Sequence, residues 1–149
     1  MNTVSVRINR RQMLGAALMA ASGLPPAMAA GADASGVKSE TLLRTSAAWD
    51  DVPYRAYPEG VPEVTFLRIT VPARGELRWH THPMPTAAYI VSEEITLETK
   101  SGQKRHFTAG QVIPETVGSV HRGVVGNRPA EFIVFYAGVK GMRLSSQES

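Results

Sequence analysis

Short β-type runs of apolar residues fill the chain from Val64 onward, and turns that contain glycine or proline separate them. Strands of this kind alternate their side chains between two faces, one of which can cover a core. The predicted strands cover residues 64–71, 76–82, 87–99 (as one or two strands), 104–108, 111–115, 120–125 and 130–137. Many short strands at regular spacing indicate a β-sandwich or β-barrel, and no helix is predicted after the first 29 residues. We therefore expect an all-β domain.

Residues 1–29 are typical of a cleaved export signal. Arg10 and Arg11 precede an apolar run over 13–24, which is shorter than the roughly 20 residues that span a bilayer. Two prolines and a small-x-small cleavage pattern follow and end at Ala29. The paired arginines resemble a twin-arginine signal, which exports folded proteins in bacteria. An ordinary secretory signal and a retained membrane anchor are the alternatives. We expect cleavage after Ala29 and a periplasmic mature protein.

The mature chain divides into three parts. Residues 30–48 are small and polar without apolar periodicity, and we expect a flexible leader there. The domain itself is predicted to cover 49–142, and a frayed tail is predicted over 143–149.

An arm rich in proline and aromatic residues opens the predicted domain. Its aromatic residues are Trp49, Tyr54 and Tyr57, and its prolines exclude a helix. We expect these aromatic side chains to pack over the flank of the domain. An aromatic platform for carbohydrate is the alternative.

The composition of the chain narrows the partners that we expect. With 149 residues the chain is long enough for one domain with a proper core. Its net charge of +3 arises in the first 29 positions, and removing them leaves 13 basic and 13 acidic residues. Net charge therefore gives no support to a nucleic-acid or membrane partner of the mature protein. The chain has no cysteine, which excludes disulfides and thiolate metal ligands.

Two of the four histidines, His80 and His82, are separated by one residue in a predicted strand. Residues i and i+2 of a strand project from the same face, about 6.6 Å apart along the backbone. Two such imidazoles can converge on one metal ion, and His121 precedes another strand that fold closure can bring alongside. A surface pair of histidines on a loop is the alternative interpretation.

The residues around these histidines follow an ordered pattern. Gly75 precedes the histidine pair, and Gly110, Pro114 and His121 occur in this order farther along. The two groups resemble the two motifs of the cupin superfamily, and the resemblance covers about residues 64–138. It implies a single-domain jelly-roll β-barrel with a metal site, and a homodimer by analogy with other small cupins.

The sequence departs from the cupin pattern at Thr86, which stands where the first motif usually has a glutamate. His80, His82 and His121 remain as metal ligands, and this set resembles cupins that bind divalent iron with histidines alone, among them thiol and diketone dioxygenases. The resemblance implies one divalent metal ion. We prefer Fe or Mn over Zn, Cu or Ni, because folding before export lets the protein load a weaker-binding ion in the cytoplasm.

Two further residues are candidates for catalytic roles. Glu115 lies six residues before His121, and it is a fourth ligand, a general acid or base, or an exposed loop residue. Tyr89 is either a hydrogen-bonding group inside the barrel or a core aromatic residue. His106 lies in a polar hairpin arm, and we expect it at the surface.

Three functions are compatible with these observations. The first is a metal-dependent enzyme of the oxygenase type that acts on a small molecule, although the fold also supports isomerase and lyase chemistry. The second is a periplasmic protein that binds a metal or a small ligand without catalysis. The third is a metal-free structural barrel.

Overall fold

The computed structural model describes residues 36–148. The predicted signal, 1–29, and the first part of the predicted leader lie outside the described residues. The chain divides after Lys38, and the second unit, Ser39–Ser149, contains all the described strands. None of the described residues form a helix long and apolar enough to cross a membrane.

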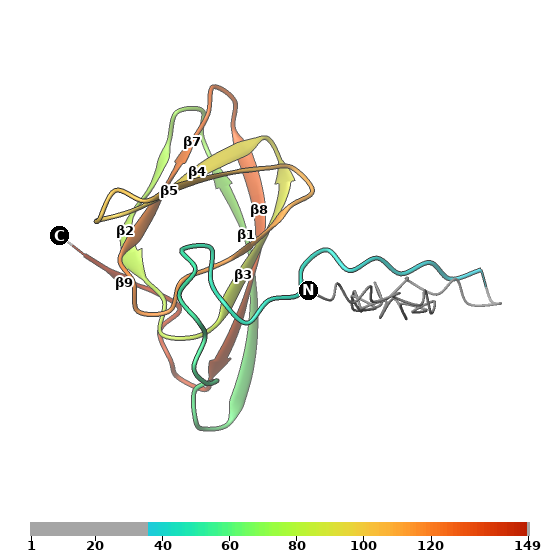
Figure 1. The fold of residues 1–149 in the computed structure, drawn as a ribbon, viewed down its shortest axis with the longest axis vertical. Coiled ribbons are helices and arrows are strands. Elements are labelled where there is room, and N and C mark those ends of the chain that lie inside the picture. The colour runs from blue at the N-terminus through green and yellow to red at the C-terminus, as the bar shows by residue number, and fades with distance from the viewer. Residues whose placement is uncertain (1–35, 149) are drawn as a thin grey trace, which may run out of the picture. The chain divides into compact units, whose positions relative to one another are not determined.

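Nine strands make up this unit (Figure 1). In chain order they are β1 (Pro62–Val71), β2 (Glu76–Thr81), β3 (Thr86–Ser92), β4 (Glu94–Thr99), β5 (Lys104–Thr108), β6 (Val112–Pro114), β7 (His121–Val125), β8 (Ala130–Val139) and β9 (Ser146–Gln147). Each predicted strand has a counterpart, and the predicted run over 87–99 is two strands, β3 and β4. The all-β prediction is confirmed.

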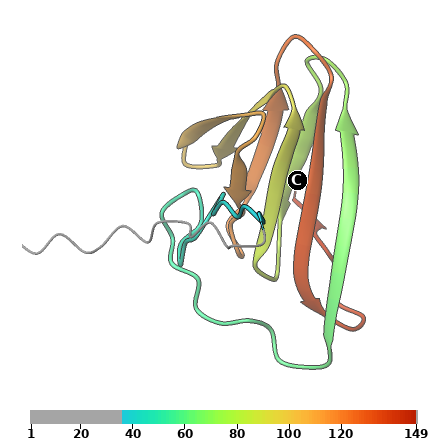
Figure 2. The ribbon, with the colours of Figure 1, turned by 90° about the vertical axis from the view of Figure 1, so that its right-hand side faces the viewer.

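The strands form two antiparallel sheets that pack face to face (Figure 2). One sheet has the order β1-β8-β3-β6 and the other has the order β5-β4-β7-β2-β9. Strands that are neighbours in one sheet are often distant in sequence, as in the pairing of β1 with β8 along the full length of both strands. This arrangement of crossing connections is that of a jelly roll.

The core lies between the two sheets and consists of side chains on their inner faces, together with Trp49 and Met84 from segments outside the strands. Its buried apolar residues are Trp49, Val71, Met84, Ala88, Ile90, Ile95, Leu97, Phe107, Ile113, Val125, Ala130, Phe132, Val134 and Tyr136. Alternate residues of β8 (Ala130, Phe132, Val134 and Tyr136) are buried, whereas the residues between them are partly exposed. This period of two is what a strand with one covered face requires.

Strand β2 contains a β-bulge immediately before the histidine pair. Leu77 is opposite Gly123 and His80 is opposite His121, so two residues of β2 face the single residue Arg122 of β7. Because a bulge adds one residue to a strand, it reverses which side chains face inward beyond it. Leu77 and His80 therefore point into the same interior although an odd number of positions separates them.

The predicted arm packs on the domain in the expected way for two of its three aromatic residues. Trp49 is fully buried in the core, and its backbone N–H donates to the carbonyl of Pro114 at the end of β6. Tyr54 is half-buried, whereas Tyr57 is exposed. The predicted leader ends earlier than expected, because Ala48 is also buried and its N–H donates to the carbonyl of Val52.

The prediction of a frayed tail over 143–149 is corrected by the structure. Ser146 and Gln147 form β9, which pairs with β2 opposite Thr81 and His80. The N–H of Glu148 also donates to the carbonyl of Trp79. The side chains of this segment are polar and exposed, so backbone pairing to a strand edge, and not burial, holds it in place.

Candidate metal centre

The three histidines predicted as metal ligands come together at one end of the interior. Strand β2 and the residue after its end supply His80 and His82, and the first residue of β7 supplies His121. The ring centroids lie 4.8 Å apart for His80 and His82, 4.4 Å for His80 and His121, and 5.3 Å for His82 and His121. One ring nitrogen of each lies within 4.8 Å of those of the other two, which makes them a group able to hold a metal ion.

The backbone fixes the tautomers of the first two rings. Nδ1 of His80 lies 2.6 Å from the carbonyl oxygen of Arg78, and Nδ1 of His82 lies 2.8 Å from that of Leu144. A carbonyl oxygen only accepts hydrogen bonds, so both Nδ1 atoms carry the hydrogen and both Nε2 atoms keep a free lone pair. This is the state in which a histidine binds a metal through Nε2.

The loop before β7 fixes the third ring in the same way. Nδ1 of His121 lies 3.1 Å from the carbonyl oxygen of Ser119 and 2.9 Å from Oγ1 of Thr116. The Thr116 hydroxyl donates to that same carbonyl, so it accepts from His121. His121 therefore also carries a hydrogen on Nδ1 and turns Nε2 toward the other histidines, and the fully buried Thr116 is part of its support.

Glu115 is buried beside the histidines, so it is not an exposed loop residue, which was one of the three alternatives from the sequence. Its Oε2 lies 3.2 Å from Nε2 of His121, which makes an ion pair when His121 is protonated, although neither buried atom has a hydrogen-bond partner of good geometry among the described residues. Buried polar atoms are rarely left unpaired in folded proteins. A metal ion bound by both atoms would satisfy them in place of the proton.

Burial and the neighbouring charges both shift the pKa values of these buried groups. Burial is the main influence on His80 and His82 and lowers the pKa of each. Burial alone would raise the pKa of Glu115, but the neighbouring histidines, His121 first, outweigh it and lower that pKa. In the same pair, Glu115 raises the pKa of His121 against the effect of burial. The carboxyl group is therefore ionised near neutral pH and supplies one negative charge to the site.

The backbone places Glu115 next to the position where cupins usually carry their glutamate. Its N–H donates to the carbonyl of Thr86 at 2.9 Å, and its own carbonyl accepts from the hydroxyl of Tyr54 at 2.8 Å. Thr86 itself is buried, and its hydroxyl donates to the carbonyl of Met84. A carboxylate thus approaches the histidines from the strand next to the usual one.

Tyr89 does not lie in the site. Thr86, Ala88 and Ile90 of β3 face the core, so Tyr89 projects from the opposite, exposed face of the sheet. The tyrosine in the interior is Tyr136 of β8, whose ring centroid lies 5.7 Å from that of His82. Burial, with a contribution from Glu115, raises the pKa of Tyr136 to about 12, so its hydroxyl stays protonated.

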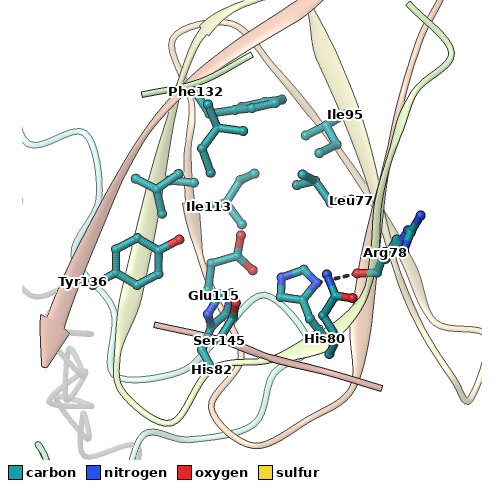
Figure 3. Close-up of a pocket in the computed structure, with 14 residues that line it drawn as sticks. Leu77, Arg78, His80, His82, Ile95, Ile113, Glu115, Phe132, Tyr136 and Ser145 are labelled. Carbon is teal, nitrogen blue, oxygen red and sulfur yellow. Dashed lines mark hydrogen bonds between the residues drawn. The ribbon is translucent and has the colours of Figure 1, made fainter. Parts of the chain in front are cut away.

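A cavity of about 180 Å³ lies beside these groups (Figure 3). Its polar side carries His80, His82, Glu115 and Tyr136, and residues Ser145 and Gln147 of the C-terminal segment also line it. Figure 3 shows the carboxylate of Glu115 between the rings of Tyr136 and His80. The structure therefore places a space for a small molecule directly against the candidate ligands.

The donor set fits a divalent metal ion. Three imidazoles with free Nε2 atoms and one carboxylate are the ligands that Fe, Mn, Zn and Cu accept. The orphaned Nε2 of His121 and Oε2 of Glu115 are the structural observation that supports this fit. His106 takes no part, because it lies on the exposed face of β5, where its ring contacts Thr96 and Glu94.

Several contributors to the site were not predicted from the sequence, among them Thr116, Tyr136, Ser145, Gln147 and the carbonyl groups of Arg78, Ser119 and Leu144. For Tyr136 a signal was available, since it continues the buried alternation of Phe132 and Val134 in a strand that was predicted. The other contacts come from a loop, from the short polar C-terminal segment and from backbone atoms, which carry no periodic pattern.

The chain matches no protein-family model and no curated protein. Solved structures do resemble it. The DMSP lyase DddQ from Ruegeria pomeroyi superposes with a TM-score of 0.50 and 18% identity over 56% of this chain and 42% of the lyase. A structure from a study of the DMSP lyases RdDddP and RnDddQII gives a TM-score of 0.51 and 13% identity over 58% of this chain and 44% of that one.

A cupin-like protein from Thermotoga maritima gives a TM-score of 0.50 and 10% identity, over 58% of this chain and 65% of that protein. The matches to the first two structures span less than half of those proteins' length. At these identities the likeness shows the fold alone. The chain has the cupin fold, as its sequence motifs predicted.

Proposed function

We propose that this protein is a metal-dependent enzyme that acts on a small molecule in the bacterial periplasm. The observation that carries the proposal is the group of three histidines, each of which has a ring nitrogen within 4.8 Å of those of the other two. Backbone and side-chain oxygens hold the Nδ1 atoms of His80, His82 and His121, which leaves the three Nε2 atoms to face the interior, and Oε2 of Glu115 lies 3.2 Å from one of them. Such support by outer groups is what a metal site requires.

His80, His82 and His121 would hold the ion, and Glu115 would complete the set. A divalent ion supplies Lewis-acid chemistry there and, if it is redox-active, it also activates dioxygen. Glu115, ionised because the neighbouring histidines lower its pKa, can accept a proton from a substrate in the cavity. Tyr136 keeps its proton and can donate a hydrogen bond or a proton to the same substrate. Much of the rest of the cavity wall is apolar.

Oxygenase-type chemistry with Fe or Mn is the function that we favour, because an ion held by three histidines and one carboxylate would have positions open for a substrate and dioxygen. Lyase chemistry is a second candidate. The observation that favours it is the pairing of an ionised Glu115 with a protonated Tyr136 in one cavity, which suits removal and return of a proton. Two proteins with this fold are named as lyases, although a shared fold does not imply a shared reaction.

Metal analysis of the full chain, purified after export by its own signal, tests the proposal. We expect about one equivalent of Fe or Mn per chain, lost in a His80→Ala/His121→Ala double variant and retained in His106→Ala. Oxygen uptake with a panel of small molecules then separates oxygenase from lyase chemistry. One equivalent of Zn or Cu in exported protein would contradict the preference for Fe or Mn. Metal content no higher than in the double variant would contradict the metal site itself.

A further inference from the structure

The cavity has two sides of opposite chemistry. One side holds His80, His82, Glu115 and Tyr136. The other side is apolar, and its residues are Ile69, Leu77, Ala88, Ile95, Ile113, Phe132 and Val134. In Figure 3 the labelled apolar side chains of Leu77, Ile95, Ile113 and Phe132 gather at the end away from His80 and His82. A molecule that reaches the histidines therefore lays the rest of its body against hydrocarbon.

The apolar side offers no partner for a charge. Among the described residues that line the cavity, Arg78 is the only one with a cationic side chain besides the histidines. That side chain is exposed, and Figure 3 shows it turned away from the cavity while its carbonyl faces His80. A negative charge at the apolar end of the cavity would be buried without a counter-ion, which is strongly unfavourable.

The charge at the polar side limits the ligand as well. A divalent ion, three neutral imidazoles and one carboxylate sum to a single positive charge. One anionic group on the ligand neutralises the site, and a second has nowhere to bind. The volume of about 180 Å³ is also below the roughly 300–1,000 Å³ of pockets for drug-sized ligands. The body of the ligand is therefore small.

We propose that the cavity binds a small molecule with one anionic, metal-binding head and an apolar body, and that it excludes compounds with a second anionic group. This inference rests on the proposed metal site. It names the substrate class of that site by charge and shape, and it depends on the apolar wall as much as on the ligands.

Calorimetric titration of the metal-loaded full chain with three probes tests the inference. Acetate has the head alone, hexanoate has the head and an apolar body, and adipate has the length of hexanoate with a second carboxylate. Each buried CH₂ group contributes about 0.8 kcal/mol, so we expect hexanoate to bind at least tenfold more tightly than acetate. Adipate should bind at least tenfold more weakly than hexanoate. Adipate binding as tightly as hexanoate would overturn the inference.

Ala88 and Ala87 provide a matched pair of variants. Ala88 is buried and lines the cavity, whereas Ala87 is its neighbour on the opposite face of β3. Ala88→Val and then Ala88→Leu should reduce hexanoate affinity in step with added volume, tenfold or more for leucine, and leave acetate affinity unchanged. Ala87→Leu should change neither. An equal loss for acetate and hexanoate in Ala88→Val would contradict the apolar body site, even if Ala88→Leu fails to fold.

Different results would contradict the proposed metal site and the inferred class of ligand. If the protein takes up no metal, or if metal-free protein binds hexanoate as well as loaded protein does, the proposed metal site is wrong. If the protein takes up metal and prefers acetate to hexanoate, the metal site stands and the inference about the ligand is wrong.

Discussion

The ring of His82 is held by the carbonyl oxygen of Leu144, which lies 2.8 Å from its Nδ1 and 62 positions away in the sequence. This contact ties a candidate metal ligand to the C-terminal segment. The same segment pairs with β2 opposite His80 and Thr81. The candidate metal site therefore has all of its hydrogen-bond support only when the C-terminal segment is paired with β2.

Shortening the chain to end at Arg143 should therefore weaken metal binding. Loss of an outer hydrogen-bond partner of a ligand histidine typically lowers metal affinity about 10–100-fold, and we expect a loss in that range. Competition with a chelator of known affinity measures it. A chain that ends at Gln147 keeps Leu144 and β9 and serves as the control. Equal affinity in the two shortened chains would show that the carbonyl of Leu144 is dispensable.

Single histidine replacements distinguish a candidate metal ligand from a surface histidine. His82→Ala should reduce the bound metal to a small fraction of one equivalent, because it removes a ligand whose ring the backbone holds in place. His106→Ala should retain the metal, since that ring lies on the exposed face of β5 beside Glu94. Elemental analysis of both variants decides the assignment, which an equal loss from the two would refute.

Glu115→Gln tests the role of the buried carboxylate. The substitution keeps the size of the side chain and removes its charge. If Glu115 is a ligand, metal affinity should fall by about tenfold or more. If it acts only on protons, metal content should be unchanged and turnover should fall, commonly by about 10²–10⁴-fold for a general base. Glu94→Gln, on the exposed face, should alter neither quantity, and a variant of Glu115 with unchanged metal affinity and turnover would exclude both roles.

Tyr54→Phe removes the hydrogen bond that positions Glu115. The Tyr54 hydroxyl donates to the carbonyl of Glu115 at 2.8 Å, so its loss should lower the free energy of unfolding by about 1 kcal/mol. Tyr57 is 73% exposed, so Tyr57→Phe is the matched control and should change little. Urea denaturation near neutral pH measures both differences.

The contribution of Tyr54 should also depend on pH in the alkaline range. Burial is the main reason why the pKa of Tyr54 rises from 10.0 to about 12. The unfolded chain therefore loses this proton at lower pH than the folded chain, and stability falls as pH rises between these two values. The contribution is fully present below pH 10 and is lost through pH 12. The wild type should lose more stability than Tyr54→Phe across this interval, and parallel curves would contradict the shift.

The sequence was sufficient to predict that the three histidines come together, but it was insufficient to predict the residues around them. The spacing of His80 and His82 predicted both rings on one strand face, His121 was expected alongside through fold closure, and the resemblance to cupin motifs supported all three. The assignment of Tyr89 was wrong because β3 is apolar on both faces: Ala87, Tyr89 and Val91 alternate with Ala88 and Ile90. Apolar character alone does not distinguish the two faces of such a strand.

The C-terminal segment was missed for a different physical reason. Residues 145–149 are polar, so they carry no apolar periodicity that would indicate a strand. Their attachment uses backbone groups of β2, which any sequence can provide. Glu115 could be predicted only in part. Its nearness to His121 in sequence suggested a role, but only the pairing of its backbone with Thr86 brings it into the interior.

The bulge between Leu77 and His80 makes the site sensitive to the length of β2 as well as to its composition. Deleting one of the two bulged residues would restore regular pairing with β7 and turn the histidine pair toward the solvent, with every ligand still present in the sequence. Related chains that keep both histidines but differ by one residue at this point would therefore lack the inward-facing histidine pair. Counting the residues between Leu77 and His80 is a more informative criterion for a working site than finding the two histidines.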